Sequence, residues 1–211
     1  MNAFITVCEP PEKRAAHCTG GKERHLTEAA VMIAFAMYLL DTGAAEVEIH
    51  PDGEHGKRYD IRACLESLGF TLTASHGTTR YGGVYRRGHH AVSVSPRSGF
   101  GDVVAKIGGN AFVAECKGGI TNTDHAGQVA RLRRGLCEAV GQLMVRPAVG
   151  ERNIAVVPET PATKKLAERM RHRTLAAGIE IALVDERGRV EFIARSEAAR
   201  ALKHGHSADA S

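Results

Sequence analysis

The hydrophobic positions of the chain recur with two spacings, that of a helix and that of a strand. Residues 27–40 are apolar on nearly every side, a pattern typical of a helix at the centre of a fold or at an interface. The helical spacing recurs three times further along, with apolar residues mainly on one face. It predicts helices over residues 57–68, 124–144 and 161–177, with Asp124 as a cap of the second.

Short apolar runs between these helices predict strands. Two runs, residues 102–107 and 111–117, are joined by Gly108-Gly109-Asn110, which is a strong signal for a β-hairpin. Residues 1–25 are polar, contain a Pro-Pro and a Gly-Gly pair, and are expected to form an arm or irregular extension. Residues 47–49 form either a strand or the end of a helix. Further strands are expected at residues 70–74, 91–95, 154–157, 179–184 and 189–193.

The order of these elements predicts an α/β layer protein with a mixed sheet. An antiparallel hairpin comes first, and strand–helix–strand crossovers follow it. We expect residues 1–56 to form an N-terminal arm and helix and residues 57–194 to form the core. Residues 195–211 are expected to be a flexible C-terminal tail.

The composition narrows the class of protein. Of 211 residues, 43% are hydrophobic and 25% are charged, which is the balance of a globular protein. The net charge of +4 permits a polyanionic partner. The longest apolar run, residues 29–40, is shorter than the roughly 20 residues that a membrane span needs. We expect no signal peptide, and the five unevenly spaced cysteines favour free thiols and a cytoplasmic location.

Three ionisable residues of the predicted hairpin are expected on one of its faces. Glu115 and Lys117 are two apart on the second strand, so their side chains point to the same side. If residues 108–109 form the turn, Asp102 lies opposite Glu115, and if residues 109–110 form it, Asp102 lies opposite Lys117. Both registers gather the three residues, whereas a three-residue turn without a bulge would separate Asp102 from the others by one position.

Two carboxylates in a largely apolar hairpin repel each other and are costly to bury unless a cation neutralises them. Lys117 supplies one positive charge, and Mg²⁺ is the natural source of the rest, because it takes oxygen ligands from one or two carboxylates and keeps water. We expect Asp102 and Glu115 to bind Mg²⁺, or Mn²⁺ in its place, with the Cys116 carbonyl as a third ligand. Such a site activates water for attack on phosphorus, and Lys117 would orient that water or stabilise the phosphate.

Asp102, twelve intervening residues and then Glu115-Cys116-Lys117 resemble the motif of the PD-(D/E)xK nuclease superfamily, which has the restriction-endonuclease-like fold. The resemblance covers about residues 57–193 in layout, but in motif only the hairpin and residues 138–142. It implies a three-layer α/β/α core with a mixed central sheet and an N-terminal helical extension. The usual proline before the aspartate is Gly101 here, a difference that affects the turn more than the chemistry.

The resemblance also implies roles for polar residues on two helices. Gln142 is similar to the glutamine on the helix of many superfamily members, where it would hold the backbone or a phosphate, and Glu138 would line the metal site. A solvated helix face is the alternative for both. Glu28 would be the additional helix carboxylate that many members carry, or an acid that complements the helix dipole from the first turn. Asp60 and Glu66 compete for that role with less support.

A Gly-rich segment before the hairpin carries the cations that we expect to bind nucleic acid. Its arginines would hold the phosphate backbone without reading base sequence, and Tyr81 and Tyr85 would stack on bases. The alternative is a flexible, solvated loop. The arginines concerned are Arg80, Arg86, Arg87 and Arg97.

These observations predict a Mg²⁺-dependent endo- or exonuclease that hydrolyses phosphodiester bonds, with DNA the favoured polymer. The small size and the apolar helix 27–40 suggest a homodimer, with a separate protein partner possible and no membrane association. A non-catalytic nucleic-acid-binding or assembly module on the same fold is the first alternative. A small-molecule phosphoesterase is the second. In a third, Glu115 and Lys117 are solvated residues of an edge strand without chemistry.

Overall fold

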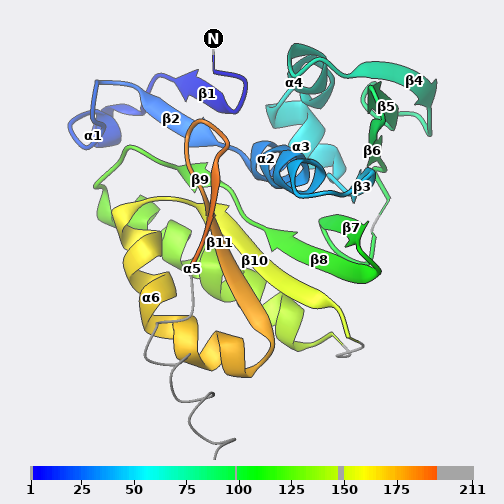
Figure 1. Cartoon of the computed structure of the whole chain (residues 1–211). Helices are drawn as coiled ribbons and strands as arrows, with labels where there is room; N and C mark the ends of the chain where they lie inside the picture. The colour runs from blue at the N-terminus through cyan, green and yellow to red at the C-terminus, as the bar shows by residue number, and fades with distance from the viewer. Residues whose placement is uncertain (1, 98, 147–149, 194–211) are drawn as a thin grey trace, which may run out of the picture.

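The centre of the protein is a nine-stranded mixed sheet, seen in a computed structural model that describes residues 2–97, 99–146 and 150–193 (Figure 1). Strand β10 runs parallel to both of its neighbours and β3 runs parallel to β6, while the other neighbours are antiparallel. The chain is therefore a mixed α/β protein, as predicted. Across the sheet the strands are β12 (Val190–Phe192), β11 (Ile179–Val184), β10 (Arg152–Pro158), β8 (Asn110–Cys116), β7 (Val103–Ile107), β3 (Glu46–Ile49), β6 (His90–Val94), β5 (Gly83–Arg87) and β4 (Thr71–Ser75).

Helices cover both faces of this sheet. The helices α2 (Glu28–Asp41), α3 (Gly53–Arg58) and α4 (Ile61–Ser67) lie on one face, and α5 (Ala126–Met144) and α6 (Pro161–Ala176) lie on the other. Strand β10 contributes to both cores: Ile154 and Val156 pack with α2, and the alternate residues Ala155 and Val157 pack with α5. Because both faces of the strand are buried, its sequence is continuously apolar.

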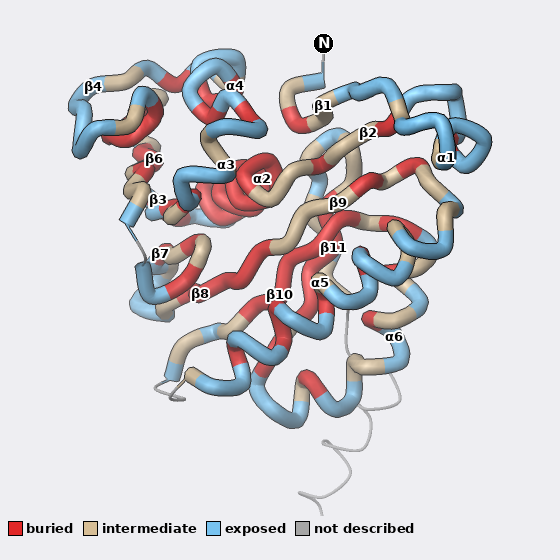
Figure 2. The backbone as a smooth tube through the Cα atoms, turned by 180° about the vertical axis from the view of Figure 1, so that it is seen from behind, coloured by how far each residue is buried: buried red, intermediate tan, exposed pale blue. Residues whose placement is uncertain are grey.

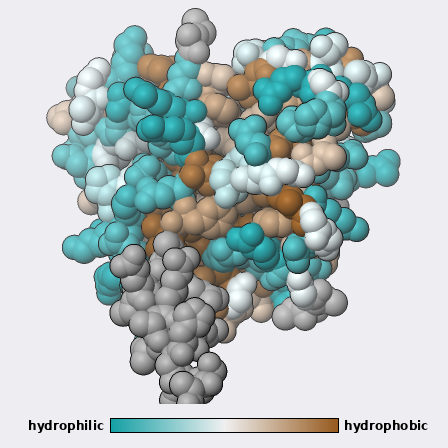
Figure 3. All heavy atoms as spheres, in the orientation of Figure 1, coloured by the Kyte–Doolittle hydropathy of each residue, from teal (hydrophilic) through white to brown (hydrophobic). Residues whose placement is uncertain are grey.

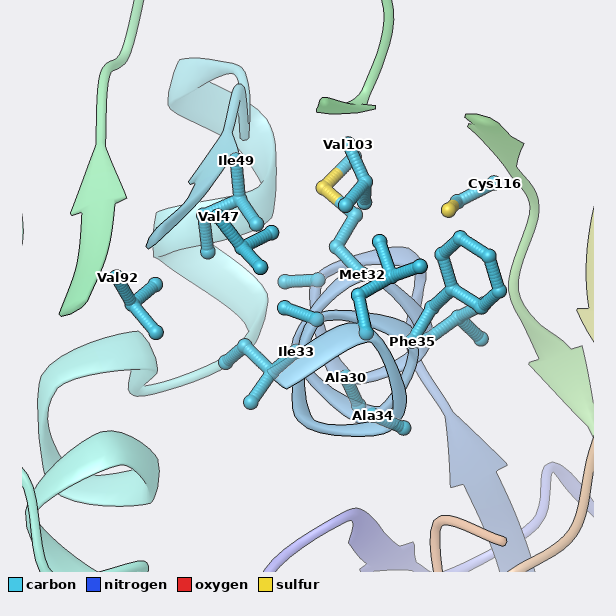
Figure 4. Close-up of a cluster of buried hydrophobic side chains, with 14 of the residues drawn as sticks. Ala30, Met32, Ile33, Ala34, Phe35, Val47, Ile49, Val92, Val103 and Cys116 are labelled. Atoms are coloured by element: carbon cyan, nitrogen blue, oxygen red, sulfur yellow. The ribbon is translucent and has the colours of Figure 1, made fainter. Parts of the chain in front are cut away.

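Helix α2 lies inside the fold. Ten of its fourteen residues are buried, and Figure 2 shows it as buried while the outer surfaces of α5 and α6 are exposed. Figure 4 shows its side chains surrounded by residues of β3, β6, β7 and β8, among them Val47, Val92 and Cys116. The Thr27 hydroxyl accepts a hydrogen bond from the Ala30 N–H at 3.2 Å and caps the helix. Since the chain itself covers this apolar helix, the helix no longer argues for a homodimer.

The first 25 residues are not the irregular extension that the sequence predicted. They contain β1 (Ile5–Cys8), the one-turn helix α1 (Glu12–Ala15) and β2 (Glu23–Leu26). Strands β1 and β2 pair with each other, and β2 also pairs with β9 (Gly119–Ile120) in a three-stranded sheet. The prediction failed because both strands have only four residues, β2 is largely polar, and the second partner of β2 comes from a distant part of the sequence.

Two predicted helix boundaries and one turn were also wrong. The sequence pattern of Asp52-Gly53 is also that of a turn, but Asp52 is the N-cap of α3, where its side chain accepts N–H bonds from Glu54 and His55. The helix predicted over residues 57–68 is divided into α3 and α4. Helix α5 has His125 at its N-cap position, while Asp124 instead pairs with His17 at 2.7 Å. The Gly-rich segment before the hairpin forms β5 and β6, an antiparallel pair.

The predicted division of the chain near residue 56 stays a prediction. Strand β3 lies on its N-terminal side, yet pairs with β6 and β7 on its C-terminal side. The expected C-terminal tail, residues 195–211, lies outside the described residues.

The surface combines hydrophilic and hydrophobic residues. Hydrophilic residues occupy much of the face seen in Figure 3, with hydrophobic ones visible through its middle. In the part of the chain that the structure describes, no helix combines the length and the apolar character needed to cross a membrane.

Candidate active site

The hairpin β7–β8 adopts the first of the two registers that the sequence allowed. Ile107 pairs with Asn110 around a Gly108-Gly109 turn, and Val103 pairs with Ala114. Both turn glycines have positive φ, 55° and 83°, which a two-residue type I′ turn requires. Continuing this register by one residue places Asp102 opposite Glu115, on the same face of the sheet.

Asp102 is fixed by the backbone on both sides of it. Its carboxylate Oδ2 accepts the N–H of Cys116 at 2.7 Å, and its own N–H donates to the Ala114 carbonyl at 2.9 Å. Its carbonyl accepts the N–H of His50 at 2.9 Å. Since the N–H and C=O of one strand residue point to the same side, the Cys116 carbonyl also faces the side of Asp102.

Glu115 is the most deeply buried charged residue of the hairpin, with a side chain only 7% exposed. It alternates along β8 with Ala114 and Cys116, which pack with α2, so its side chain lies on the α5 side of the sheet. Its carboxylate forms an ion pair with Arg146, which follows the end of α5.

Burial raises the proton affinity of both carboxyl groups. Burial, the negative charge of Asp102 and a hydrogen bond between the two groups raise the pKa of Glu115 to about 7, although Arg146 and Lys117 oppose the shift. Burial also raises the pKa of Asp102, with the charge of Glu28 adding to it and the Cys116 N–H opposing it. The metal-free pair is therefore electrostatically unfavourable when both groups are ionised.

Lys117 extends from the end of β8 into a cluster of ionisable side chains. Its Nζ lies 3.2 Å from Glu28 Oε1 and 3.8 Å from Glu138 Oε1. The same Glu28 oxygen lies 3.5 Å from Nε2 of His55. Because Nδ1 of His55 accepts the Asp52 N–H at 3.1 Å, the neutral ring carries its proton on Nε2 and donates it toward Glu28.

In this cluster, the attraction between opposite charges shifts the pKa values more than burial does. Burial works to lower the pKa of Lys117, but the charges of Glu28 and Asp102 raise it above its ordinary value. Burial works to raise the pKa of Glu28, but His55 and Lys117 lower it. Burial works to lower the pKa of His55, and its bond to Glu28 raises it. Lys117 is therefore a cation at neutral pH and acts as a hydrogen-bond donor, not as a base.

A pocket of about 460 Å³ opens beside this cluster. Gly118 lets the chain pass close to the start of α2, because a Cβ there would lie 2.6 Å from the Thr27 carbonyl carbon. Gly135 of α5 similarly leaves room for the side chain of Lys117. Six cationic or titratable basic side chains and two carboxylates line the pocket: His25, His55, Arg58, Lys117, Arg131, Arg134, Glu28 and Glu138.

The donor groups of the hairpin fit a hard divalent cation. Asp102 is half-buried and Glu115 is buried, and desolvation raises the pKa of both carboxyl groups. A cation between them would relieve their repulsion. The Cys116 carbonyl faces the same side. Among the described residues, no three side chains of His, Cys, Asp or Glu are grouped so that they could hold one metal ion. The predicted ligand set contains two such side chains and one backbone oxygen.

Some of the predicted site residues lie together and others do not. Asp102, Glu115 and Lys117 share one end of the hairpin, and Glu28 and Glu138 both approach Lys117. Gln142 is exposed on α5 and does not line the pocket, so the structure does not bring it to Lys117.

The predicted nucleic-acid-binding arginines lie away from the pocket. Arg86 and Arg87 are on β5, which β6 and β3 separate from the hairpin, and Arg80 and Arg97 lie in the loops that flank β5 and β6. Arg87 stacks on Phe70, with its guanidinium carbon 4.6 Å from the ring centre, and donates to the Leu68 carbonyl at 2.9 Å. The guanidinium of Arg87 is thus already bound within the fold.

The two tyrosines predicted to stack on bases are buried, so this prediction was wrong. The hydroxyl of Tyr85 donates to the Tyr81 carbonyl at 2.9 Å, and that of Tyr81 donates to the Asp52 carbonyl at 3.2 Å. Tyr81 lies in the loop before β5 and Tyr85 lies on β5 itself, and both rings pack into the core.

Sequence reasoning missed four basic residues of the site. Arg134 lies three residues after Arg131 on the polar stripe of α5, and this spacing was visible in the sequence. His55 and Arg58 are brought in by α3, which begins before the helix predicted over residues 57–68. No local signal identified Arg146, because it pairs with a residue 31 positions away.

Comparisons with protein-family models, with curated proteins and with solved structures found no match to this chain. The functional argument therefore depends on the geometry of the site.

Proposed function

We propose that this protein is a metal-dependent nuclease that hydrolyses phosphodiester bonds of DNA. The observation that carries the proposal is the facing pair of a half-buried Asp102 and a buried Glu115, both with a raised pKa, beside a protonated lysine at a pocket lined by arginines. A fold needs no such pair for stability, since buried like charges cost free energy.

The Asp102 and Glu115 carboxylates and the Cys116 carbonyl would hold Mg²⁺ or Mn²⁺. When bound, the ion supplies Lewis-acid stabilisation of phosphate oxygens and lowers the pKa of water. The hydrogen bond from the Cys116 N–H orients the Asp102 carboxylate for this task. The hairpin β7–β8, followed by helix α5 and by β10 parallel to β8, supports the resemblance to PD-(D/E)xK nucleases and a restriction-endonuclease-like fold.

Lys117 would bind the scissile phosphate or the attacking water with its ammonium group. Its pKa is raised, so it keeps its proton and stabilises negative charge by donating hydrogen bonds. Glu28 and Glu138 hold Nζ from two helices, which restricts where the ammonium group points. Both acids thereby act as positioning residues for Lys117.

The cations of the pocket favour a polymer over a small phosphoester. Arg58 of α3 and Arg131 and Arg134 of α5 line the same pocket as Lys117, on two different elements. Phosphates that flank a scissile bond would be bound by such separated guanidinium groups, giving salt-dependent affinity without base readout. A single small phosphoester would leave several of these cations unpaired.

Incubation with linear, circular and branched DNA, with Mg²⁺ or with a chelator, tests the proposal. We expect Mg²⁺-dependent cleavage, lowered by about a thousandfold in Asp102→Asn and in Lys117→Met. Lys106→Met is the matched control, because Lys106 is an exposed residue of the same hairpin. Cleavage by Asp102→Asn at the wild-type rate would overturn the proposal.

The same samples distinguish a binding module on this fold. Such a module would bind DNA through the arginines of the pocket and cut no substrate under any metal condition. Equal DNA binding by wild type and Asp102→Asn, without cleavage by either, is its expected result.

A further inference from the structure

Arg146 occupies the active site from a position that no motif marks. It follows the end of α5, and its Nη2 forms an ion pair with Glu115 Oε1. Its side chain is 18% exposed, and its guanidinium carbon lies 5.3 Å from the centre of the Phe100 ring. A stacked and largely buried arginine is held more firmly than a surface one.

The backbone beside Asp102 leaves space for this guanidinium. A Cβ on Gly101 would lie 3.0 Å from Arg146 Nη1 and 2.7 Å from Val113 Cγ1. The absence of a side chain at Gly101 therefore lets Arg146 approach Glu115 over the start of β7. Glycine at position 101 thus leaves the space beside which the Arg146 guanidinium lies.

The ion pair does not satisfy every donor of the arginine. Nη1 of Arg146 is buried and finds no hydrogen-bond partner among the residues that the structure describes. A guanidinium group that leaves a buried donor unpaired loses part of the free energy that its ion pair supplies. Such a pair is easier to displace than one with every donor bonded.

We propose that Arg146 is a positioning residue that serves as the internal counter-ion of Glu115 and that the metal ion must displace. This inference rests on the proposed function, because it assigns a second cation to a carboxylate already assigned to Mg²⁺. A guanidinium and a divalent ion on one carboxylate repel each other strongly in a buried site. Arg146 thus keeps the metal-free site neutralised and raises the metal concentration at which the site fills.

Calorimetric titration of the whole chain with Mn²⁺, without nucleic acid, tests this role. We expect Arg146→Met to bind Mn²⁺ about tenfold more tightly than wild type, because the competing charge is gone. Arg146→Lys restores a cation and should return the affinity toward that of wild type. Arg62→Met is the matched control, since Arg62 pairs with Glu66 at 2.8 Å on the exposed surface of α4.

Phe100→Ala gives a second test that leaves Arg146 and Glu115 intact. Phe100 is half-exposed, so its removal frees the guanidinium at little cost to the core. We expect about two- to fivefold tighter Mn²⁺ binding, the size of a lost cation–π contact. In chelator, Arg146→Met should melt at a lower temperature than wild type, and Mn²⁺ should raise that temperature more than in wild type.

The outcomes separate the two proposals. If wild type binds Mn²⁺ and Arg146→Met binds it equally or more weakly, Arg146 is not a competing counter-ion, and the nuclease proposal stands. If wild type, Arg146→Met, Arg146→Lys and Phe100→Ala all bind no Mn²⁺, the metal-dependent function and the role of Arg146 are both overturned.

Discussion

Raising the pH from 4.5 to 8 should lower the unfolding free energy of the metal-free protein by about 3 kcal/mol through Glu115. The folded state raises the pKa of this group from 4.5 to about 7, so it binds a proton more tightly than the unfolded chain does. Each pKa unit corresponds to about 1.4 kcal/mol. The stabilising contribution is fully present below pH 4.5 and is lost as the pH rises through about 7.

The assay is denaturant unfolding in chelator at a series of pH values, with Glu115→Gln as the reference protein. Glutamine keeps the shape of the side chain and an oxygen for Arg146, but it does not titrate in this range. Groups such as Glu28, whose pKa is lowered and whose contribution has the opposite pH dependence, are common to both proteins. The difference between the two profiles therefore reports Glu115 together with its interaction with Asp102.

Wild type should lose about 3 kcal/mol relative to Glu115→Gln across this range. Mn²⁺ should restore most of that loss in wild type at pH 8 and none of it in the variant. Two profiles that stay parallel within about 0.5 kcal/mol would contradict the raised pKa of Glu115, because they would show that this group is neither desolvated nor repelled by Asp102.

Two other substitutions test the pocket. Arg134→Gln should weaken DNA binding and lower the magnitude of the slope of log K against log salt by about 0.9, the value for one phosphate contact. The neighbouring Arg133→Gln, which changes an exposed arginine outside the pocket, should change the slope less. Fluorescence anisotropy at several salt concentrations measures both slopes. Gly118→Ala should destabilise the protein by about 2–4 kcal/mol, because the new Cβ collides with the backbone at the start of α2. Gly141→Ala on α5, where nothing lies within 4 Å of the new Cβ, should be neutral or stabilising. Thermal unfolding compares the two variants, and equal melting temperatures would contradict the close approach at Gly118.

Local parts of the fold were predictable because neighbouring residues determine them. Residues 108–110 predicted the β7–β8 hairpin but left two registers open, and the Gly108-Gly109 turn of the structure places Asp102 opposite Glu115. Helix α2 was predictable as buried, since its apolar residues leave no polar face. What covers it was not, because β3, β6, β7 and β8 come from four separate segments.

The parts that were missed depend on distant residues. Nothing in residues 5–8 or 23–26 indicates pairing with Gly119–Ile120. The basic character of residues 80–97 suggested a binding surface, yet Arg87 stacks on Phe70 and the pocket takes its arginines from α3 and α5. Charge in a sequence shows that a cation is present, but the fold decides whether that cation faces a site or completes the packing.

A crystal structure with Mn²⁺ recorded at its anomalous edge would show whether Asp102 and Glu115 together hold a divalent metal ion. We expect one strong anomalous peak between the two carboxylates, at about 2.0–2.3 Å from an oxygen of each, with the Arg146 guanidinium moved away from Glu115. A fully soaked crystal with no anomalous peak between them, and with Arg146 still bound to Glu115, would contradict the account.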